Sequence, residues 1–173
     1  MKTKIVSALL LIAASLAGLA AEPVKTKPAS PEFERMKSLV GTWTGKTDMG
    51  QGPVDMTISY RLIAAGSVIE ERVFEGTPNE MVTMYYDGMD GKLALTHYCM
   101  LGNRPTMNVK SSDAKSITFD FDGSCCTIDP AKDSHMHGMV VNFVSADTIS
   151  TSCKAIMDGK EMPEHATTLK RVK

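Results

Sequence analysis

The sequence predicts an all-β protein, an antiparallel up-and-down β-barrel of about ten strands with a short N-terminal helix. Apolar and polar residues alternate in run after run from residue 41 onward, which is typical of strands with one buried face. Short turn signals such as DGMDG at 87–91 separate these runs, and no helical crossover lies between them. An open sheet of ten strands would expose two edges, so we expect the sheet to close.

The first 20 residues predict a secretory signal peptide. Two lysines precede an apolar run that ends at Leu19, and Gly18 and Ala20 are the small residues that favour cleavage after Ala20. The run is shorter than the ~20 apolar residues of a membrane-spanning helix, and no later segment is longer or more apolar. We therefore expect an exported protein, periplasmic or secreted, with no membrane span.

Residues 21–30 are expected to be a flexible leader, because they contain two prolines, two lysines and little that could pack. Residues 31–173 then form one lipocalin-like β-barrel domain, a length that suits a single core. Removing the two lysines of the signal peptide changes the formal charge from -1 to -3. This balance gives no attraction to nucleic acid, and it leaves the oligomeric state open.

The short helix is predicted just after the leader. Ser30 is a candidate N-cap, Pro31 suits the first helical position, and Gly41 marks the stop. Its expected apolar face consists of Phe33, Met36 and Val40.

The strands follow in close succession. We expect them within 41–48, 53–63, 67–75, 80–87, 92–100, 106–111, 116–122, 137–144, 148–156 and 165–173. In the second of these runs the predicted buried face consists of Val54, Met56, Ile58, Tyr60 and Leu62. A barrel of this strand number is wider than side chains alone readily fill, so we expect a small ligand near its mouth, with Tyr60 among the binding residues.

The stretch LVGTWTG, with Gly41 and Trp43, resembles the Gly-x-Trp motif of the calycins, the superfamily of lipocalins, fatty-acid-binding proteins and nitrobindins. The resemblance implies that Trp43 closes the base of the barrel and that an arginine of the last strand, Arg171, packs on its ring. Such a cation over an indole face contributes on the order of 1 kcal/mol, so the expected role of the three residues is structural.

Further stretches, among them LTHYCMLGNRPTM and DPAKDSHMHGM, make the chain similar to a bacterial exported lipocalin-like family of unknown function. That resemblance implies a fold and no reaction. The likeness to nitrobindins implies haem ligation by a histidine near the chain end, which His165 would supply, although the residues around it match poorly.

Two polar pairs stand at the ends of apolar strand faces. His97 and Cys99 share a face with two leucines, and His135 and His137 share one with Met139 in DSHMHGM. We expect these side chains to point inward. The predicted ligand-binding residues are therefore Tyr60, His97, Cys99, Arg104, His135 and His137.

A metal site is one interpretation of these histidines. His97, His135 and His137, with Cys99 as a further donor, would suit zinc or copper if their strands adjoin, and the 13 methionines add soft ligands for copper. In the alternative interpretation the same side chains hydrogen-bond to one another and to water inside a partly polar barrel. Haem is the less favoured cofactor.

Four cysteines in an oxidising compartment could form two disulfides. The adjacent Cys125 and Cys126 pair poorly with each other, so any bridges would reach to Cys99 and Cys153. An oxidised Cys99 could bind no metal.

Two charged features complete the candidates. Arg104, at the turn after His97, could clamp a carboxylate or phosphate, or it could make a surface ion pair. Glu70 and Glu71 point to opposite faces of one strand, and we expect the interior one to pair with an arginine such as Arg61.

The function predicted from these patterns is interior binding of a small, partly apolar ligand. A metal- or haem-binding protein is the first alternative, and a small-molecule hydrolase or isomerase using His97 and Cys99 is the second. We assign no catalytic residue, because the sequence contains no nucleophile elbow and its VGTWTGKT stretch lacks the first glycine of a phosphate loop.

Overall fold

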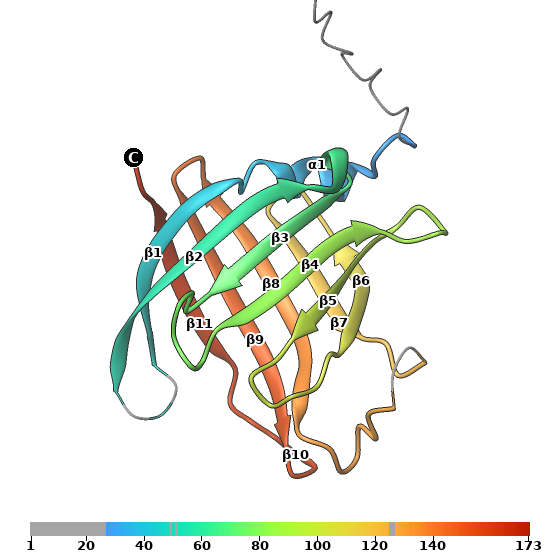
Figure 1. The fold of residues 1–173 in the computed structure, drawn as a ribbon, viewed down its shortest axis with the longest axis vertical. Coiled ribbons are helices and arrows are strands. Elements are labelled where there is room, and N and C mark those ends of the chain that lie inside the picture. The colour runs from blue at the N-terminus through green and yellow to red at the C-terminus, as the bar shows by residue number, and fades with distance from the viewer. Residues whose placement is uncertain (1–26, 49, 51, 125–126) are drawn as a thin grey trace, which may run out of the picture.

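The chain forms a closed barrel of ten antiparallel strands with one short helix, α1 (Pro31–Lys37), lying across one end (Figure 1). The computed structural model describes residues 27–48, 50, 52–124 and 127–173. The predicted fold class is thus confirmed, whereas the predicted signal peptide and residues 21–26 of the leader lie outside the described residues.

From β1 to β9 each strand pairs with the next along the chain. The bounds are β1 (Gly41–Asp48), β2 (Pro53–Ile63), β3 (Val68–Val73), β4 (Met81–Asp87), β5 (Leu93–Tyr98), β6 (Thr106–Ser112), β7 (Ser116–Phe121), β8 (His135–Ser145), β9 (Thr148–Met157), β10 (Lys160–Glu161) and β11 (His165–Arg171). β11 pairs with both β9 and β1, which closes the barrel, while the two-residue β10 pairs with β9 alone. A 3-10 turn, η1 (Ala64–Gly66), joins β2 to β3.

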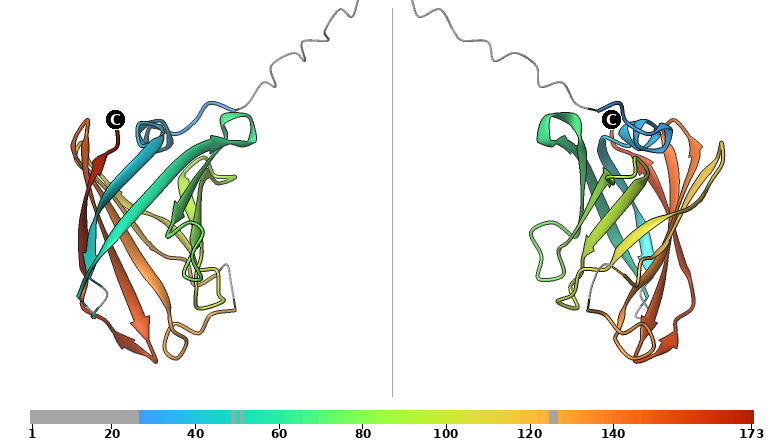
Figure 2. Two further views of the ribbon diagram at one scale, coloured as in Figure 1. Left: turned by 60° about the vertical axis from the view of Figure 1, so that its left-hand side comes forward. Right: turned by 90° about the vertical axis from the view of Figure 1, so that its right-hand side faces the viewer.

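Helix α1 is fixed to the barrel at its first residues. The Ser30 hydroxyl caps the Phe33 amide at 3.1 Å, and the amide and hydroxyl of Ser30 both donate to the Asp87 carboxylate at 2.6 Å. Phe33 and Met36 are buried in the barrel end. Figure 2 shows the helix at this same end from two further sides.

The helix ends at Lys37, earlier than predicted, and Val40 is not on its buried face. The amides of Ser38 and Leu39 bond three residues back, to the carbonyls of Arg35 and Met36, which tightens the last turn and ends the helix. Leu39 is buried instead, and Val40 is 39% exposed.

The Gly-x-Trp motif closes this end of the barrel. The Arg171 guanidinium lies 4.2 Å from the centroid of the Trp43 ring, and it donates to the carbonyls of Val40 and Ser38 at 2.9 and 2.6 Å. Gly41 has φ +128°, and a Cβ there would come within 3.0 Å of the Arg171 guanidinium. Only glycine fits both conditions.

Apolar side chains fill the part of the barrel below the helix, and hydroxyl, carboxyl and imidazole groups join them farther along. The fully buried core contains Trp43, Ile58, Ile69, Leu93, Leu95, Met107, Ile117, Phe119, Val141, Ile149 and Leu169. On β2, Ile58 and Tyr60 are buried as predicted. Val54 and Leu62, at the two ends of the strand, are 42% and 43% exposed, so they were wrongly placed on the buried face.

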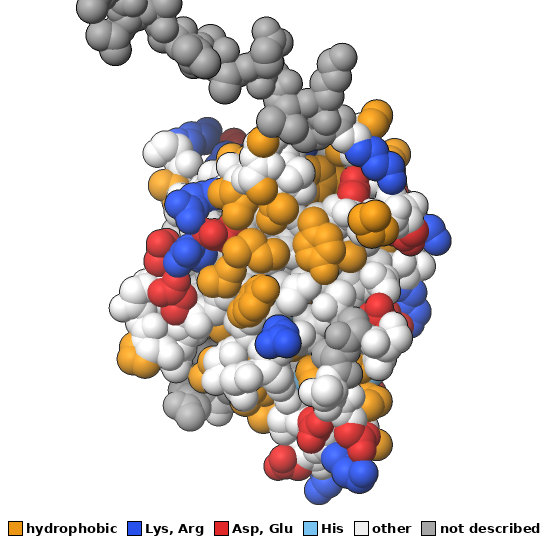
Figure 3. Space-filling view, turned by 45° about the vertical axis from the view of Figure 1, so that its right-hand side comes forward, with side chains coloured by type: hydrophobic (Ala, Val, Ile, Leu, Met, Phe, Trp, Pro, Cys, Tyr) orange, Lys and Arg blue, Asp and Glu red, His pale blue; other side chains and the backbone are white. Residues whose placement is uncertain are grey.

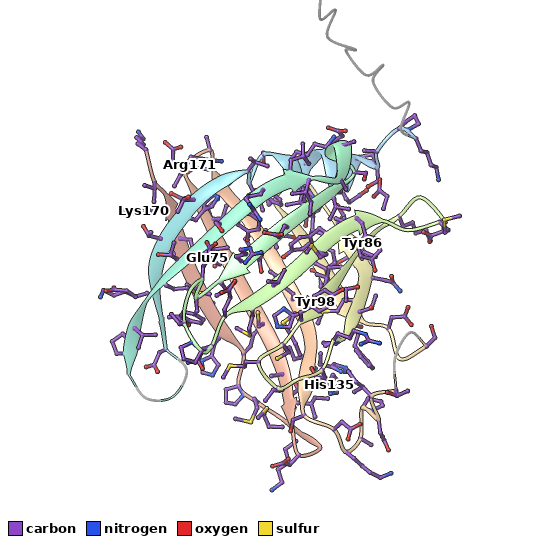
Figure 4. The ribbon with its side chains drawn as sticks, viewed as in Figure 1. Glu75, Tyr86, Tyr98, His135, Lys170 and Arg171 are labelled. Carbon is purple, nitrogen blue, oxygen red and sulfur yellow. The ribbon has the colours of Figure 1, made fainter. Side chains whose placement is uncertain are left out.

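The outer wall of the barrel carries hydrophobic side chains as well as charges. Figure 3 shows a group of them on the face formed by the middle strands, where Val82, Met84 and Tyr86 are half-buried and Tyr98 is exposed. Tyr86 and Tyr98 are labelled in Figure 4. Among the described residues, no helix combines the length and the hydropathy needed to cross a bilayer.

Candidate functional site

The interior of the barrel contains a buried carboxyl group, that of Glu71 on β3. Its cross-strand neighbours are Tyr60 on β2 and Thr83 on β4, so all three side chains share the inner face. The Tyr85 hydroxyl donates to one carboxyl oxygen of Glu71 at 2.8 Å, and the Thr83 hydroxyl donates to the other at 3.1 Å. Glu71 is only 3% exposed.

No cation balances this carboxyl. Among the described residues, no lysine, arginine or histidine lies within ion-pair distance of Glu71. Burial raises the pKa of the Glu71 carboxyl above its usual value, and the surrounding hydroxyl donors oppose that shift only in part. Glu71 is therefore a buried acid held by neutral donors.

The hydrogen-bond chain continues from Thr83 to His97. The Thr83 hydroxyl lies 3.0 Å from Nδ1 of His97. Since the single hydroxyl proton of Thr83 is donated to Glu71, Nδ1 of His97 must donate to the Thr83 oxygen, and Nε2 is then an acceptor. Burial lowers the pKa of His97 to about 4, so the ring is neutral near pH 7.

The two tyrosines of the cluster differ in their partners. The Tyr85 hydroxyl lies 3.4 Å from the Met139 sulfur in addition to its bond to Glu71. The Tyr60 hydroxyl, 1% exposed, lies close enough to Glu71 to lower the pKa of that carboxyl, but no hydrogen bond of acceptable geometry joins it to the described residues. Burial and the neighbouring Glu71 raise the pKa of both phenols well above 10. Tyr60 therefore has an unused hydrogen-bonding group in the interior.

Cys153 marks where this interior meets solvent. It lies opposite Met139 and alternates with the inward-facing Thr151 of β9. Protein surrounds its position, which raises the pKa of the thiol to about 12, with a further contribution from the Glu71 charge across the barrel. The side chain is nevertheless solvent-exposed. An exposed side chain on the inner face means that solvent enters the barrel at this level.

Glu70, the neighbour of Glu71, faces outward and corrects the predicted pairing. One oxygen of its carboxylate accepts bonds from Arg61 and Arg72, both at 2.6 Å. The arginine expected to neutralise the interior glutamate therefore neutralises the exterior one, because Arg61 and Glu70 are cross-strand partners on the outer face.

The prediction that His135 and His137 point inward holds only in part, because His135 is fully buried while His137 is half-buried at a β-bulge. A β-bulge between Met136 and Gly138 interrupts the alternation, so Met136, rather than His135, shares the face of Met139. The His135 ring packs 4.7 Å from that of Phe121. Figure 4 shows His135 at the end of the barrel away from α1.

These two imidazoles hydrogen-bond to each other. Nδ1 of His135 lies 2.7 Å from the carbonyl oxygen of Asp133, which can only accept, so Nδ1 carries the proton. Nε2 of His135 then accepts from Nδ1 of His137 at 3.0 Å. Only one of the four ring nitrogens, Nε2 of His137, keeps a free lone pair.

The predicted three-histidine metal site is not assembled. Within the described part of the chain, no group of three or more His, Cys, Asp or Glu side chains is placed to hold a metal ion. His97 bonds to Thr83, while His135 and His137 bond to each other. These donors do not fit zinc or copper, which need several unprotonated nitrogens around one point.

His165 also fits its implied cofactor poorly. It lies exposed at the start of β11, opposite Cys153, and among the described residues its ring makes no hydrogen bond. Axial histidines are held in orientation by a second hydrogen bond, so we derive no haem chemistry from His165.

Cys99 and Arg104 lie in the turn after β5. Burial raises the pKa of the Cys99 thiol, which is opposite to what an activated nucleophile needs. Arg104 is exposed. Cys99 and Cys153 are free thiols, and Cys125 and Cys126 lie outside the described residues, so the bridging of this adjacent pair to Cys99 and Cys153 stays a prediction.

The sequence thus predicted Tyr60 and His97 of this cluster. It pointed to Glu71 only as one of two glutamates of which one lies inside, and to Cys153 only as a disulfide candidate. It gave no indication of Thr83 and Tyr85. A usable signal existed for Glu71, which alternates with Ile69 and Val73 in VIEERV. Glu70 shares its face with Arg72, and that face is the outer one.

Comparisons with known proteins give no functional assignment. No family model matches the chain, and no curated protein does. A structure of a protein with unknown function from the DUF3598 family of Nostoc punctiforme aligns with 88% of this chain and 53% of its own, at 14% identity and a TM-score of 0.43. The chain thus spans about half the length of that protein.

Proposed function

We propose that this chain is an exported barrel protein that binds a small, partly apolar ligand in its interior, next to Glu71. The observation that carries the proposal is the buried Tyr60 hydroxyl, which lies beside Glu71 without a hydrogen bond of acceptable geometry, in a cluster where the other hydroxyls are bonded. A buried polar group without a partner is costly, and a ligand would supply one.

The surroundings of the cluster suit such a ligand. Met56 and Met81 are half-buried and lie on the same faces of β2 and β4 as Tyr60 and Tyr85. Their flexible thioethers adapt to ligands of different shape. Interior sites of this kind combine an apolar lining with a few fixed polar groups, here Tyr60, Glu71 and His97.

The test is binding of N-phenyl-1-naphthylamine, a neutral apolar fluorophore whose emission rises on transfer from water. We expect saturable binding to the wild-type protein. Cys153→Phe fills the interior and should abolish it, whereas Lys154→Phe adds the same ring to the outer face of β9 and should leave it unchanged. Circular dichroism and thermal melts check that both variants fold.

Two outcomes would overturn the proposal. Folded wild-type protein that leaves the fluorophore in water has no accessible apolar interior. Equal binding to the wild type and to folded Cys153→Phe would place the fluorophore outside the barrel.

We also propose export, and membership of the exported lipocalin-like family that the sequence resembles. Lys2, Lys4 and the apolar run that ends at Leu19 support the proposal of export. N-terminal sequencing of the protein from its native source should read from Ala21. A mature protein that begins at Met1 would contradict the proposal.

A further inference from the structure

We propose that the interior site takes a small organic cation, a protonated amine, whose ammonium group donates hydrogen bonds to Glu71 and His97. This inference rests on the proposed function and adds the chemical class of the ligand. It follows from the donors and acceptors that the barrel interior presents.

The carboxyl group of Glu71 has spare acceptor capacity. Two carboxylate oxygens offer about four lone-pair positions, and hydrogen bonds from Tyr85 and Thr83 occupy one on each oxygen. The remaining positions call for N–H or O–H donors. Thr83 and Tyr85 have already placed their protons on Glu71, and Tyr60 has a single proton to offer, so a ligand is the source of further donors.

His97 presents a second acceptor in the same cluster. Nδ1 of His97 donates to Thr83, and Thr83 donates to Glu71, so Nε2 of the neutral His97 ring is unprotonated. This nitrogen makes no hydrogen bond to the described residues. The ring stays neutral near pH 7. The unpartnered oxygen of Tyr60 is a third group that can accept.

The charge of the cluster selects against anions. A carboxylate or phosphate ligand would meet the Glu71 carboxyl with no lysine or arginine of the described inner wall beside it. An ammonium ligand would instead supply the counter-charge that Glu71 lacks, and buried carboxylates are strongly favoured by such a partner.

The aromatic and apolar neighbours suit the rest of an amine. The rings of Tyr60 and Tyr85 flank Glu71, and the electron-rich face of a phenol attracts cations. The Met139 sulfur and the half-buried Met81 offer apolar contact to an alkyl chain.

The experiment compares three six-carbon compounds as competitors of N-phenyl-1-naphthylamine at pH 7.5: hexylammonium, 1-hexanol and hexanoate. With wild-type protein, hexylammonium should displace the fluorophore at a concentration at least about tenfold lower than 1-hexanol, since a charge-assisted hydrogen bond adds more than 1 kcal/mol. Hexanoate should be the weakest competitor.

Two adjacent residues give matched variants. Glu71→Gln keeps the size of the side chain and removes the interior charge, so hexylammonium and 1-hexanol should compete within about threefold of each other. Glu70→Gln makes the same change on the outer face and should keep the wild-type preference.

The outcomes separate this inference from the proposed function. If the fluorophore binds inside but hexylammonium has no advantage over 1-hexanol, or keeps its advantage in Glu71→Gln, the cation inference is wrong and interior binding stands. If hexanoate competes best, the site takes anions. If the fluorophore does not bind at all, both proposals fall.

Discussion

Glu70 and Glu71 are consecutive residues of β3, yet they occupy opposite electrostatic environments on the two walls of the barrel. On the outer wall, the guanidinium of Arg72, together with Arg61, holds the pKa of Glu70 below its usual value. On the inner wall, burial raises the pKa of Glu71, whose partners are uncharged hydroxyls. The alternation of one strand thus creates a satisfied charge outside and an uncompensated acid inside.

This difference separates structural roles from binding roles. The outer carboxylate, itself 5% exposed, is part of a network that extends from Arg72 to Glu80 at 2.6 Å, and the partly exposed partners of Glu70 keep its contribution to stability modest. The inner carboxyl lacks a counter-charge, a condition that proteins commonly keep for a ligand or a reaction. Four measurements test whether the two walls differ in this way.

The largest expected effect concerns His97 on the inner wall. Its folded-state pKa of about 4 lies below the unfolded value, so the unfolded chain binds the proton more tightly. Stability should fall as the pH drops from ~6.5 to ~4, with about 3 kcal/mol of the loss due to His97. Urea denaturation across this range measures it, and His97→Gln should lack this component.

The control for His97 is His165→Gln, which changes an exposed ring at the barrel mouth. Its pH profile should follow that of the wild type. A difference between wild type and His97→Gln that stays constant with pH would contradict the burial of a neutral imidazole.

The second effect compares alanine substitutions on the two walls at pH 5.5. Glu71→Ala leaves the hydroxyls of Tyr85 and Thr83 without their acceptor and opens a void, so we expect a loss of about 2 kcal/mol or more. Glu70→Ala leaves Arg61 and Arg72, whose side chains are 59% and 29% exposed and can be hydrated, so it should cost about 1 kcal/mol or less. Urea denaturation again gives both values, and equal losses would contradict the distinction between the walls.

The barrel itself could be predicted from the sequence because its signals are local. Alternation within each run, short turns between runs and the Gly-x-Trp motif together gave the ten strands and the closing contact of Trp43 with Arg171. Predictions were less accurate at strand and helix ends. Val40, Val54 and Leu62 are exposed there, since burial at an end depends on what covers it.

The site was harder to predict because it depends on contacts between strands distant in sequence. The bulge at Met136–Gly138 breaks the alternation between Met139 and His137, and no local pattern in DSHMHGM predicts it. In MVTMYYD both strand faces are apolar enough to be buried, so the pattern does not show whether Thr83 and Tyr85 point into the barrel or away from it. Tyr60 and His97, whose strands have one polar face, were placed correctly inside.

The third effect is a difference in sign between the two glutamates. Because the folded-state pKa of Glu71 is raised, its contribution to stability should fall as the pH rises from the unfolded value through the folded one. Because that of Glu70 is lowered, its contribution should be lost as the pH falls through the folded value.

The measurement for this third effect is the stability difference between wild type and variant from pH 2.5 to pH 8, because the Glu70 change lies below its unfolded pKa of about 4.5. Relative to the wild type, Glu71→Gln should gain stability as the pH rises, and Glu70→Gln should lose it. We expect both changes to be smaller than the His97 effect. Slopes of the same sign would mean that the two carboxyls share one kind of environment.

The smallest effect distinguishes two tyrosines of the inner wall. Tyr85→Phe removes a donor from Glu71 and should cost about 1 kcal/mol. Tyr60→Phe removes a hydroxyl that makes no hydrogen bond of acceptable geometry, so the stability of the free protein should change by less than about 0.5 kcal/mol. If Tyr60→Phe costs as much as Tyr85→Phe, its hydroxyl is already bonded in the free protein and offers nothing to a ligand. If stability is unchanged while hexylammonium competes more weakly, the Tyr60 hydroxyl is part of the binding site and has no structural role, because its only partner is then the bound amine.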